Sequence, residues 1–425
     1  MFDPRTAVRP QGAAPRILLY SHDSWGLGHL RRSLTLAGGL VERFPAADVL
    51  IATGSPCATQ FPLPERVEVV KLPSVSKDGH GAYVPRSLGC GLDAVLDLRS
   101  SLLLALCRSF APSLLVVDHQ VLGLRRELLE VLIAVKRRGA RTILGLRDIL
   151  DTPARVAEEW ASPEVQWALE EGYDRLCVYG VPEVFDPRCE YRLPPRAAAR
   201  TAFMGYVVRP GKSLQGVAGN GKRDDSGSGH DGNGNGDHPP RRPRVLVTVG
   251  GGEDGCERIE RYLDAIALAP THWDSTIITG PLMPNAQVRS LKQRAVRMRG
   301  VLVRRFHADL PSLMRQSAAV VAMCGYNISA EILQSRRPAI FLPRTFPRSE
   351  QLLRALRFSH LGLSQCLVDP RPQELRGAIA RALTLSSPAG YVPSLDGCLH
   401  LCESAAELLG ESSMSAAGVS ARPLP

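Results

Sequence analysis

The sequence lacks the features that would place the protein in a membrane or in an oxidising compartment. No apolar run approaches the ~20 residues that a membrane-spanning helix needs, and the opening MFDPRTAVRPQGAAPR has no apolar core of the signal-peptide kind. The ten cysteines form no CxxC pair and follow no regular spacing, which predicts reduced thiols in a cytoplasmic protein. No DxD-type motif stands in a suitable place, so we expect no metal and no cofactor.

Acidic residues are scarce, and the chain of 425 residues carries a formal net charge of +10. Between Arg289 and Arg305 there are seven basic residues and no acidic one. A solvated helix face is the plain interpretation of this stretch. The alternatives are attraction to nucleotide donors or to anionic lipid headgroups, which would bring the protein to the inner face of the membrane as a peripheral partner. No aromatic residue interleaves the basic residues, so we expect no nucleic-acid partner.

The first half of the chain alternates short apolar runs with amphipathic stretches. Helices are expected over Leu92–Ser109 and Leu124–Arg138, and another begins near His29. This alternation favours a parallel sheet with helices on both faces. The loop before His29, SHDSWGLG, is not GxGxxG and so does not indicate a dinucleotide site. The apolar runs predict strands at Ile17–Tyr20, Asp48–Ala52, Val67–Leu72, Leu114–Val117, Thr142–Leu146 and Arg175–Tyr179.

The second half repeats the pattern and predicts another Rossmann-like domain of six strands. Helices are expected near 256–267, 285–298, 309–316, 327–335, 348–359 and 371–384. The strands are predicted at Val245–Val249, Thr276–Thr279, Val301–Val303, Ala319–Ala322, Ala339–Leu342 and Cys366–Val368.

Composition sets the boundaries between these parts. Residues 211–242 are glycine-rich, polar and nearly free of large apolar side chains, so they cannot bury enough surface to offset the entropy lost on ordering. We predict a disordered N-terminus over 1–15, an N-terminal domain over 16–210, a disordered linker over 211–242, a C-terminal domain over 243–395, a last helix over 396–410 and a disordered tail over 411–425.

The stretch from Val320 to Arg357 contains the strongest chemical signal. A predicted strand leads into the turn Cys324-Gly325-Tyr326-Asn327, and Asn327 is expected to cap the helix that follows. A helix N-terminus offers free backbone N–H groups and partial positive charge, which favour a phosphate. Glycine lets the backbone approach that phosphate closely. Glu331, on the second turn of the helix, can accept hydrogen bonds from two neighbouring hydroxyls, as on a ribose.

The spacing Gly325…Glu331…Pro343…Glu350-Gln351 resembles the donor-binding half of GT-B glycosyltransferases. It is most similar to those related to the N-acetylglucosaminyltransferase of lipid II synthesis and to a bacterial group of predicted glycosyl transferases. The resemblance covers residues 16 to 385, with a break near 211 to 242. It implies an α/β fold of two Rossmann-like domains that face each other across a cleft, with the acceptor on the N-terminal side and a nucleotide-sugar donor on the C-terminal side.

The resemblance also implies the roles of single residues in the donor site. Glu331 would bind the ribose, and Glu350 with Gln351 would contact the sugar. Arg344 would neutralise phosphate charge, with a solvated loop arginine as the alternative. A second glycine loop would lie under the diphosphate, although it could serve only as a tight turn. The diphosphate would therefore rest on Gly250, Gly251, Gly252, Gly325, Tyr326 and Asn327.

On the acceptor side, His29 follows Gly28 at the end of the loop that comes after the first predicted strand. Histidine has a pKa suited to removing the proton of an acceptor hydroxyl. The resemblance implies that His29 is this base and that Asp118, at the end of the strand LLVVD, pairs with it. His22 and His119 are alternative bases. A packing histidine and a structural aspartate are the plain alternatives for the pair.

These expectations together describe an inverting, metal-independent transferase that moves a hexosyl group from a UDP-sugar to an acceptor hydroxyl. The acceptor is unknown: a lipid-linked, glycan or small-molecule acceptor fits the sequence equally well. Two alternatives stay open. A UDP-sugar 2-epimerase or hydrolase uses the same fold, and a non-catalytic protein could bind the nucleotide sugar without turnover.

Overall fold

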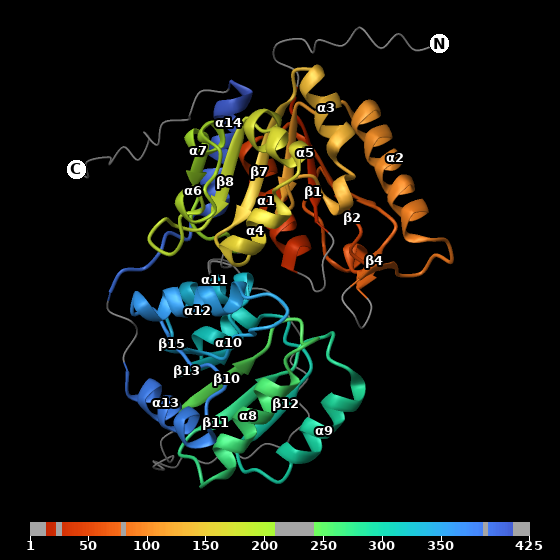
Figure 1. Cartoon of the computed structure of the whole chain (residues 1–425). Coiled ribbons are helices and arrows are strands. Elements are labelled where there is room, and N and C mark those ends of the chain that lie inside the picture. The colour runs from red at the N-terminus through yellow and green to blue at the C-terminus, as the bar shows by residue number, and fades with distance from the viewer. Residues whose placement is uncertain (1–13, 23–27, 78–81, 209–241, 386–389, 411–425) are drawn as a thin grey trace, which may run out of the picture.

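The computed structural model describes residues 14–22, 28–77, 82–208, 242–385 and 390–410. Two parallel sheets, each flanked by helices, form two Rossmann-like domains, one above the other in Figure 1. The predicted α/β class with two such domains is confirmed. The segments that we predict to be disordered, 1–15, 211–242 and 411–425, lie outside the described residues except for residues 14, 15 and 242.

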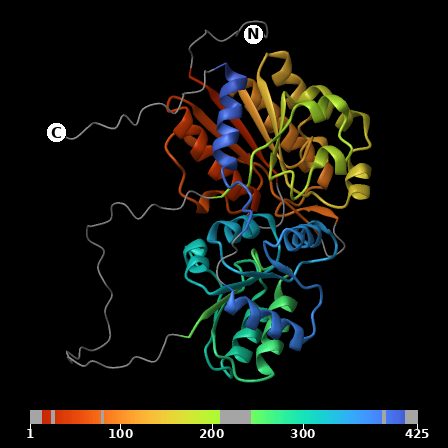
Figure 2. The same ribbon diagram turned by 90° about the vertical axis from the view of Figure 1, so that its left-hand side faces the viewer.

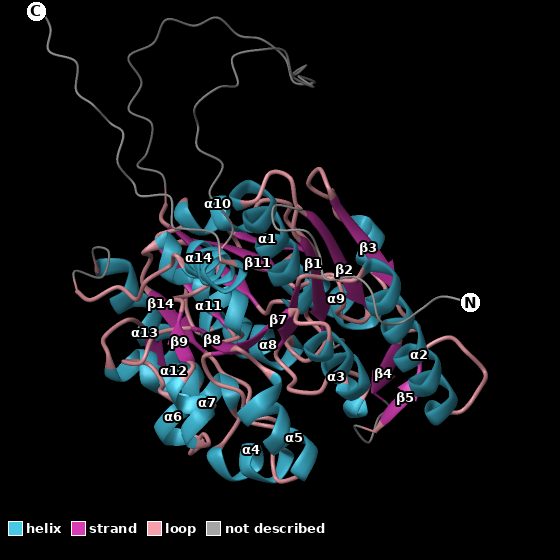
Figure 3. Ribbon diagram, turned by 90° about the horizontal axis from the view of Figure 1, so that it is seen from above, coloured by secondary structure: helices cyan, strands magenta, loops and turns pink. Residues whose placement is uncertain are grey.

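The N-terminal sheet is parallel throughout, with the strand order β3-β2-β1-β6-β7-β8-β9. Its strands are apolar on both faces because helices cover both sides of the sheet, as the strands and helices of Figure 3 show. The strands are β1 Arg16–Ser21, β2 Asp48–Thr53, β3 Val67–Lys71, β6 Leu114–Asp118, β7 Arg141–Arg147, β8 Arg175–Tyr179 and β9 Thr201–Phe203.

All six strands predicted for this domain are present. The sequence did not indicate β9 or the small antiparallel hairpin of β4 Val75–Lys77 and β5 Tyr83–Pro85. Three-residue strands are too short to show a periodic pattern. The single helix predicted over Leu124–Arg138 is wrong: a 3₁₀ turn at Leu124–Arg126, in which Arg125 has a φ of 48°, precedes a shorter α3.

The N-terminal helices lie on both sides of that sheet. No helix in the described ranges is both long enough and apolar enough to cross a membrane. The helices are α1 Gly28–Arg43, α2 Leu92–Phe110, α3 Leu129–Arg137, α4 Pro153–Glu159, α5 Pro163–Trp167, α6 Pro187–Glu190 and α7 Pro195–Ala199.

The C-terminal sheet has six parallel strands in the order β12-β11-β10-β13-β14-β15, as many as predicted. Asp309 caps α10, because its carboxylate accepts a hydrogen bond of 3.0 Å from the Ser312 N–H. The strands are β10 Arg244–Thr248, β11 Asp274–Ile278, β12 Val301–Arg304, β13 Ala319–Ala322, β14 Ala339–Phe341 and β15 Gln365–Cys366. The helices are α8 Cys256–Ala267, α9 Asn285–Ala295, α10 Leu310–Arg315, α11 Tyr326–Ser335, α12 Glu350–His360 and α13 Pro372–Thr384.

The hydrophobic core explains how the domains hold together. One apolar cluster lies between the C-terminal sheet and helices α8, α9 and α13. The other begins in the N-terminal domain and continues into the layer of α11 and α12, which face that domain in Figure 1. The last helix, α14 Gly397–Leu409, returns to pack beside α1 (Figure 2), and Arg175 donates a 2.8 Å hydrogen bond to Ser404 on it.

A fully buried ion pair crosses the interface between the domains. Asp148, just after β7, and Arg354, on α12, are both 0% exposed. The guanidinium donates from Nε and Nη2 to the two carboxylate oxygens, at 2.8 and 2.7 Å. Tyr206 donates a further bond of 2.9 Å to Asp148, and Arg354 Nη1 donates one of 2.9 Å to the Cys324 carbonyl. The pair is therefore bidentate, and additional hydrogen bonds satisfy both charges, as a buried pair requires.

Removing one partner of this pair should destabilise the protein strongly, because the other charge would stay buried and unpaired. We expect Asp148→Ala to lower the free energy of unfolding by about 3–5 kcal/mol, measured by urea denaturation. Glu190→Ala is the matched control, since Glu190 pairs with Arg357 across the same interface but in solvent, where a pair contributes about 1 kcal/mol or less. The double replacement Asp148→Leu with Arg354→Met should recover part of the loss. An unchanged urea midpoint in Asp148→Ala would contradict this role.

Candidate functional site

The topology of the two sheets places the predicted site residues opposite each other. In the N-terminal sheet the strand order reverses between β1 and β6, and in the C-terminal sheet between β10 and β13. Ligands of such sheets bind beyond the carboxyl ends of the strands at this reversal. His29 follows β1 and Asp118 ends β6, while the loop Gly250–Gly252 follows β10 and Gly325 follows β13. All four positions therefore lie at a reversal point.

His29 and Asp118 are joined by a short hydrogen bond. His29 Nδ1 lies 2.5 Å from Asp118 Oδ2, and both residues are buried. Arg32, one turn along α1 from His29, donates to both oxygens of the same carboxylate, at 2.9 and 2.8 Å. Arg32 itself lies between two aromatic rings, those of Tyr179 and Tyr326, at 5.5 and 5.1 Å. The sequence prediction paired His29 with Asp118 but did not include Arg32.

The charges in this group fix the direction of the hydrogen bond. Burial alone would raise the pKa of Asp118, but Arg32 and His29 outweigh it and hold that pKa at about 2. Burial lowers the pKa of His29 to about 4, although Asp118 opposes the shift. At neutral pH a neutral imidazole therefore faces a carboxylate. Because a carboxylate only accepts, the bond to Asp118 assigns the N–H to Nδ1 and leaves the lone pair on Nε2. Arg32 Nη2 also lies 3.0 Å from Nδ1, but its bond to Asp118 is the shorter one.

Two further histidines surround His29. The rings of His22 and His119 lie 5.7 and 5.0 Å from its ring, and burial lowers the pKa of each well below its usual value. Nε2 of His119 accepts a 3.1 Å hydrogen bond from Arg147, so it has no lone pair left for catalysis. His22 Nδ1 lies 3.5 Å from the Tyr20 hydroxyl. In the described residues, only His29 of the three is bonded to a carboxylate.

The donor-side turn meets this group directly. The structure corrects the predicted capping role of Asn327, because the helix begins one residue earlier with Gly325 as its N-cap and no side chain caps it. Asn327 Nδ2 instead donates a 3.1 Å hydrogen bond across the interface to the Gly28 carbonyl. Tyr326 is buried, and its hydroxyl accepts a 3.0 Å bond from the Val207 N–H. The start of α11 therefore lies against the start of α1.

The two glycine segments of the donor side have different surroundings. A Cβ built on Gly325 would meet nothing within 4 Å, so there is open space beside this backbone. Gly252 has a φ of 95°, and a Cβ there would lie 2.1 Å from the Thr279 carbonyl oxygen. Only glycine fits that position. The Gly251 carbonyl accepts a 2.9 Å bond from the Leu282 N–H, which anchors the loop of Gly250, Gly251 and Gly252 to the β11 side.

Arg344, Glu350 and Gln351 form one connected group. The Arg344 guanidinium bonds Asp254 at 2.7 Å and Glu350 at 2.6 Å, and its backbone N–H donates to the Gln351 side-chain oxygen at 3.2 Å. Asp254 extends from the glycine loop, so Arg344 ties that loop to the start of α12. Glu350 Oε2 is buried and has no hydrogen-bond partner.

Glu331 is only 7% exposed on the second turn of α11. The structure thus brings the donor-side residues to one end of the C-terminal sheet and sets them against His29 and Asp118. Sequence reasoning missed Arg32 and Arg354. The spacing of Arg32 from His29, three residues on one helix face, could have indicated the first of them.

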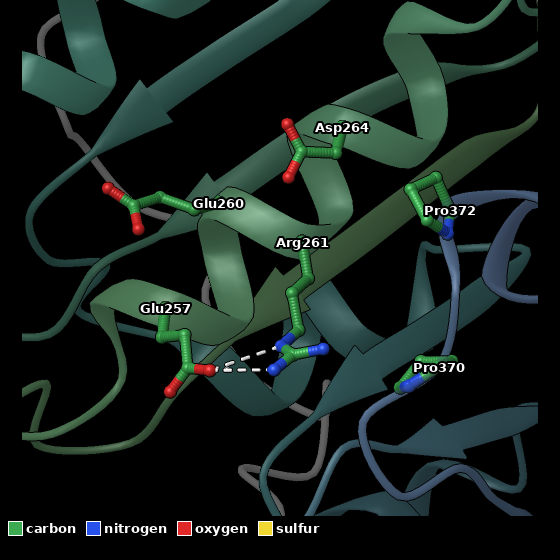
Figure 4. Close-up of a pocket in the computed structure, with 6 residues that line it drawn as sticks. All are labelled: Glu257, Glu260, Arg261, Asp264, Pro370 and Pro372. Atoms are coloured by element: carbon green, nitrogen blue, oxygen red, sulfur yellow. Dashed lines mark hydrogen bonds and ion pairs between the residues drawn. The ribbon is translucent and has the colours of Figure 1, made fainter.

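Two surface depressions lie away from these residues. A depression beside α8 is lined by acidic, basic and proline side chains on the outer face of the C-terminal domain (Figure 4), and another lies near Glu171 and Arg196. In Figure 4 an ion pair between Arg261 and Glu257 crosses the α8 depression. Within the described ranges no group of His, Cys, Asp or Glu side chains is placed to hold a metal ion.

No family model and no curated protein sequence matches the chain. Solved structures do match it over nearly its whole length. UGT2 of Phytolacca americana, complexed with UDP-2fluoro-glucose and pterostilbene, has 14% identity over 93% of this chain and 94% of its own, with a TM-score of 0.58. The calicheamicin glycosyltransferase CalG4 has 16% identity over 95% and 100%, with a TM-score of 0.59. MurG of Acinetobacter baumannii has 12% identity over 92% and 98%, with a TM-score of 0.53.

Identities this low establish the fold alone. The closer relationship to the lipid II transferases stays a prediction, since MurG is no more similar to the chain than the other two. The chain has the GT-B fold of glycosyltransferases.

The buried histidines predict that acid destabilises the protein. His29 titrates near pH 4 when folded and near 6.5 otherwise, so below pH 6.5 the unfolded chain binds more protons. Stability should be complete above pH 6.5 and fall towards pH 4, with a loss of about 2 kcal/mol at pH 5 from His29 alone. Urea denaturation at pH 7.5, 6 and 5 measures it. His29→Gln should reduce the loss of stability in acid, and His22 and His119 should account for the remainder. His360→Gln, which changes an exposed histidine, should leave the profile unchanged. A wild-type midpoint that is constant over this range would contradict the assignment.

Proposed function

We propose that the chain is a glycosyltransferase that moves a hexosyl group from a UDP-sugar to an acceptor hydroxyl. The observation that carries the proposal is the bond between His29 and Asp118, set directly against the donor-side turn by the bond from Asn327 to Gly28. A base of this kind has no use in binding alone. The fold, shared with a glycosyltransferase complexed with UDP-2fluoro-glucose, supports the same conclusion.

The reaction would be a single displacement. His29 Nε2 removes the proton of the acceptor hydroxyl while its oxygen attacks the anomeric carbon, and the bond from that carbon to the diphosphate oxygen breaks with its electrons. Attack from the side opposite the leaving group inverts the anomeric configuration. Asp118 holds the imidazole in the required tautomer and stabilises the imidazolium that forms. Arg32 keeps Asp118 ionised.

The leaving diphosphate would rest on the backbone at Gly325, where the structure has space and the N-terminus of α11 supplies partial positive charge. Glu331 would accept hydrogen bonds from the ribose hydroxyls. Glu350, whose Oε2 is without a partner, and Gln351 would accept from or donate to the sugar hydroxyls. Backbone dipoles and Arg344 take the role that a metal ion has in other transferases.

Substrate entry requires parts of the interface to separate, because His29 and Glu331 are both under 10% exposed. Reclosure would exclude water, which otherwise competes with the acceptor for the sugar. Peripheral association with an anionic membrane stays a prediction. Its basis is the basic stretch on α9 and β12, where exposed Arg289, Arg297 and Arg299 form no ion pair with the described residues.

The first test of the proposal changes the base. His29→Ala should lower kcat by about 10²–10⁴-fold, because proton removal by a positioned side chain contributes that much, while the Kd for UDP stays within about twofold. UDP release with an acceptor found by screening measures kcat, and calorimetry measures Kd. His360→Ala is the control. Full activity in His29→Ala would remove His29 from the mechanism, and steady sugar conversion without any acceptor would favour an epimerase or hydrolase.

The second test concerns the ribose contact. Glu331→Ala should raise the donor KM and the Kd for UDP by about 10–100-fold, because hydrogen bonds to a charged group are lost, and should leave kcat nearly unchanged. Glu260→Ala on the exposed face of α8 is the matched control. If the Kd for UDP is the same in Glu331→Ala as in the wild type, Glu331 does not bind the ribose.

A further inference from the structure

Arg147 ends β7 at the edge of the candidate site, where it is half-buried. Among the described residues, its guanidinium makes one side-chain hydrogen bond, the 3.1 Å contact from Nη2 to His119 Nε2, and no ion pair. Two buried arginines nearby are instead each bonded to an aspartate: Arg32 to Asp118 and Arg354 to Asp148.

The acidic neighbours of Arg147 are bonded to other arginines. Burial lowers the pKa of Arg147 to about 10, Arg32 and Arg354 add to the shift, and Glu350 and Asp118 oppose it. Glu350 bonds Arg344, and Asp118 bonds Arg32. A guanidinium that is partly withdrawn from water and not paired is costly. Within the described residues, Arg147 therefore has acidic groups nearby but no carboxylate at bonding distance.

The hydrogen-bond donors of this pair are also unused. Arginine can only donate, so His119 Nε2 accepts and Nδ1 must carry the hydrogen. Nδ1 of His119 and Nε of Arg147 are both buried and have no hydrogen-bond partner. His119 is only 7% exposed, and its φ of 72° is unusual for a residue other than glycine. Backbone strain of this kind is typical of functional sites.

We propose that Arg147 and His119 form a binding site for a carboxylate or phosphate group carried by one of the two substrates. The proposal rests on the proposed function and names a class of substrate for it. An anion would accept a hydrogen bond from the unused Nε of Arg147 and would pair with its charge. His119 would hold the guanidinium in place through the bond at Nε2. His119 lies beside the base, with its ring 5.0 Å from that of His29. The anion would thus be close to the reacting hydroxyl, on the acceptor or on the transferred sugar.

The site can be tested without knowing the acceptor. Inorganic phosphate is titrated into protein saturated with UDP, so that the donor's own phosphate site is already filled, and its Kd is measured by calorimetry. Arg147→Gln should weaken phosphate binding about tenfold or more, because a charge-assisted bond is lost, and Arg147→Lys should restore part of it. Arg126→Gln, which alters an exposed arginine of the same domain, should have no effect.

A second pair of measurements identifies which substrate carries the anion. If it is the donor sugar, Arg147→Gln weakens UDP-glucuronate binding about tenfold and leaves UDP-glucose unchanged. If it is the acceptor, both donors bind as in the wild type. In an acceptor screen, Arg147→Gln then raises KM for acceptors with a carboxylate or phosphate and not for their neutral analogues.

The failures of the two proposals look different. Should UDP not bind the wild type, the proposed function fails before the anion site is tested with phosphate. Should UDP bind, and phosphate then bind the wild type and Arg147→Gln equally or bind neither, the anion site is wrong and the transferase proposal stands. A UDP affinity equal to that of the wild type shows that Arg147→Gln is folded. If that variant does not fold, phosphate binding is compared between the wild type and His119→Asn instead.

Discussion

The buried bond between Asp148 and Arg354 is the contact on which the arrangement of the site depends. It joins the end of β7 to α12, and Arg354 also holds the Cys324 carbonyl, one residue before Gly325. One guanidinium therefore sets the position of the donor-side turn relative to the N-terminal strand ends. Because Asp148 follows Arg147, the same bond fixes the strand end beside His119. Rigid support of this kind holds catalytic groups at a productive distance.

Around that bond the charges are arranged in a consistent way. Arg32 and Arg354 are each paired with a buried aspartate. The pairs fix the positions of the side chains and add little net charge. Arg147, which has no ion-pair partner among the described residues, lies beside His119. A transfer that releases a diphosphate builds up negative charge, and a site with fixed positive groups and few waters stabilises it without reorganising. The neutral imidazole of His29 fits the same scheme, because a cationic one could not accept a proton.

The strands and helices were largely predictable from the sequence, because they depend on local apolar periodicity. The errors in secondary structure are short elements, namely β9, the β4–β5 hairpin and the 3₁₀ turn before α3. The other errors concern side chains. Asparagine is a residue type that often caps helices. The Asn327 side chain instead bonds Gly28, which is 299 residues away in the sequence. Arg354 and Asp148 are 206 residues apart, and nothing in the sequence near either one indicates the other. The pairing of His29 with Asp118 was predicted from the family resemblance, and it agrees with the position of Asp118 at the end of a strand, because strand ends of a parallel sheet converge. Which strand ends lie side by side depends on the order of the strands in the sheet. That order is known only from the folded structure.

The contacts across the interface also differ in the free energy needed to break them. Arg357 with Glu190 and Arg348 with Glu159 are exposed ion pairs, which contribute about 1 kcal/mol or less. The bond from Asn327 to Gly28 is a neutral one of similar strength. Separating Asp148 from Arg354 would instead leave two charges in an apolar interface. In the opening that we propose for substrate entry, the cost would be least if the His29 side of the interface parted while Asp148 and Arg354 stayed together. The ion pair would then be the fixed point about which the domains close again.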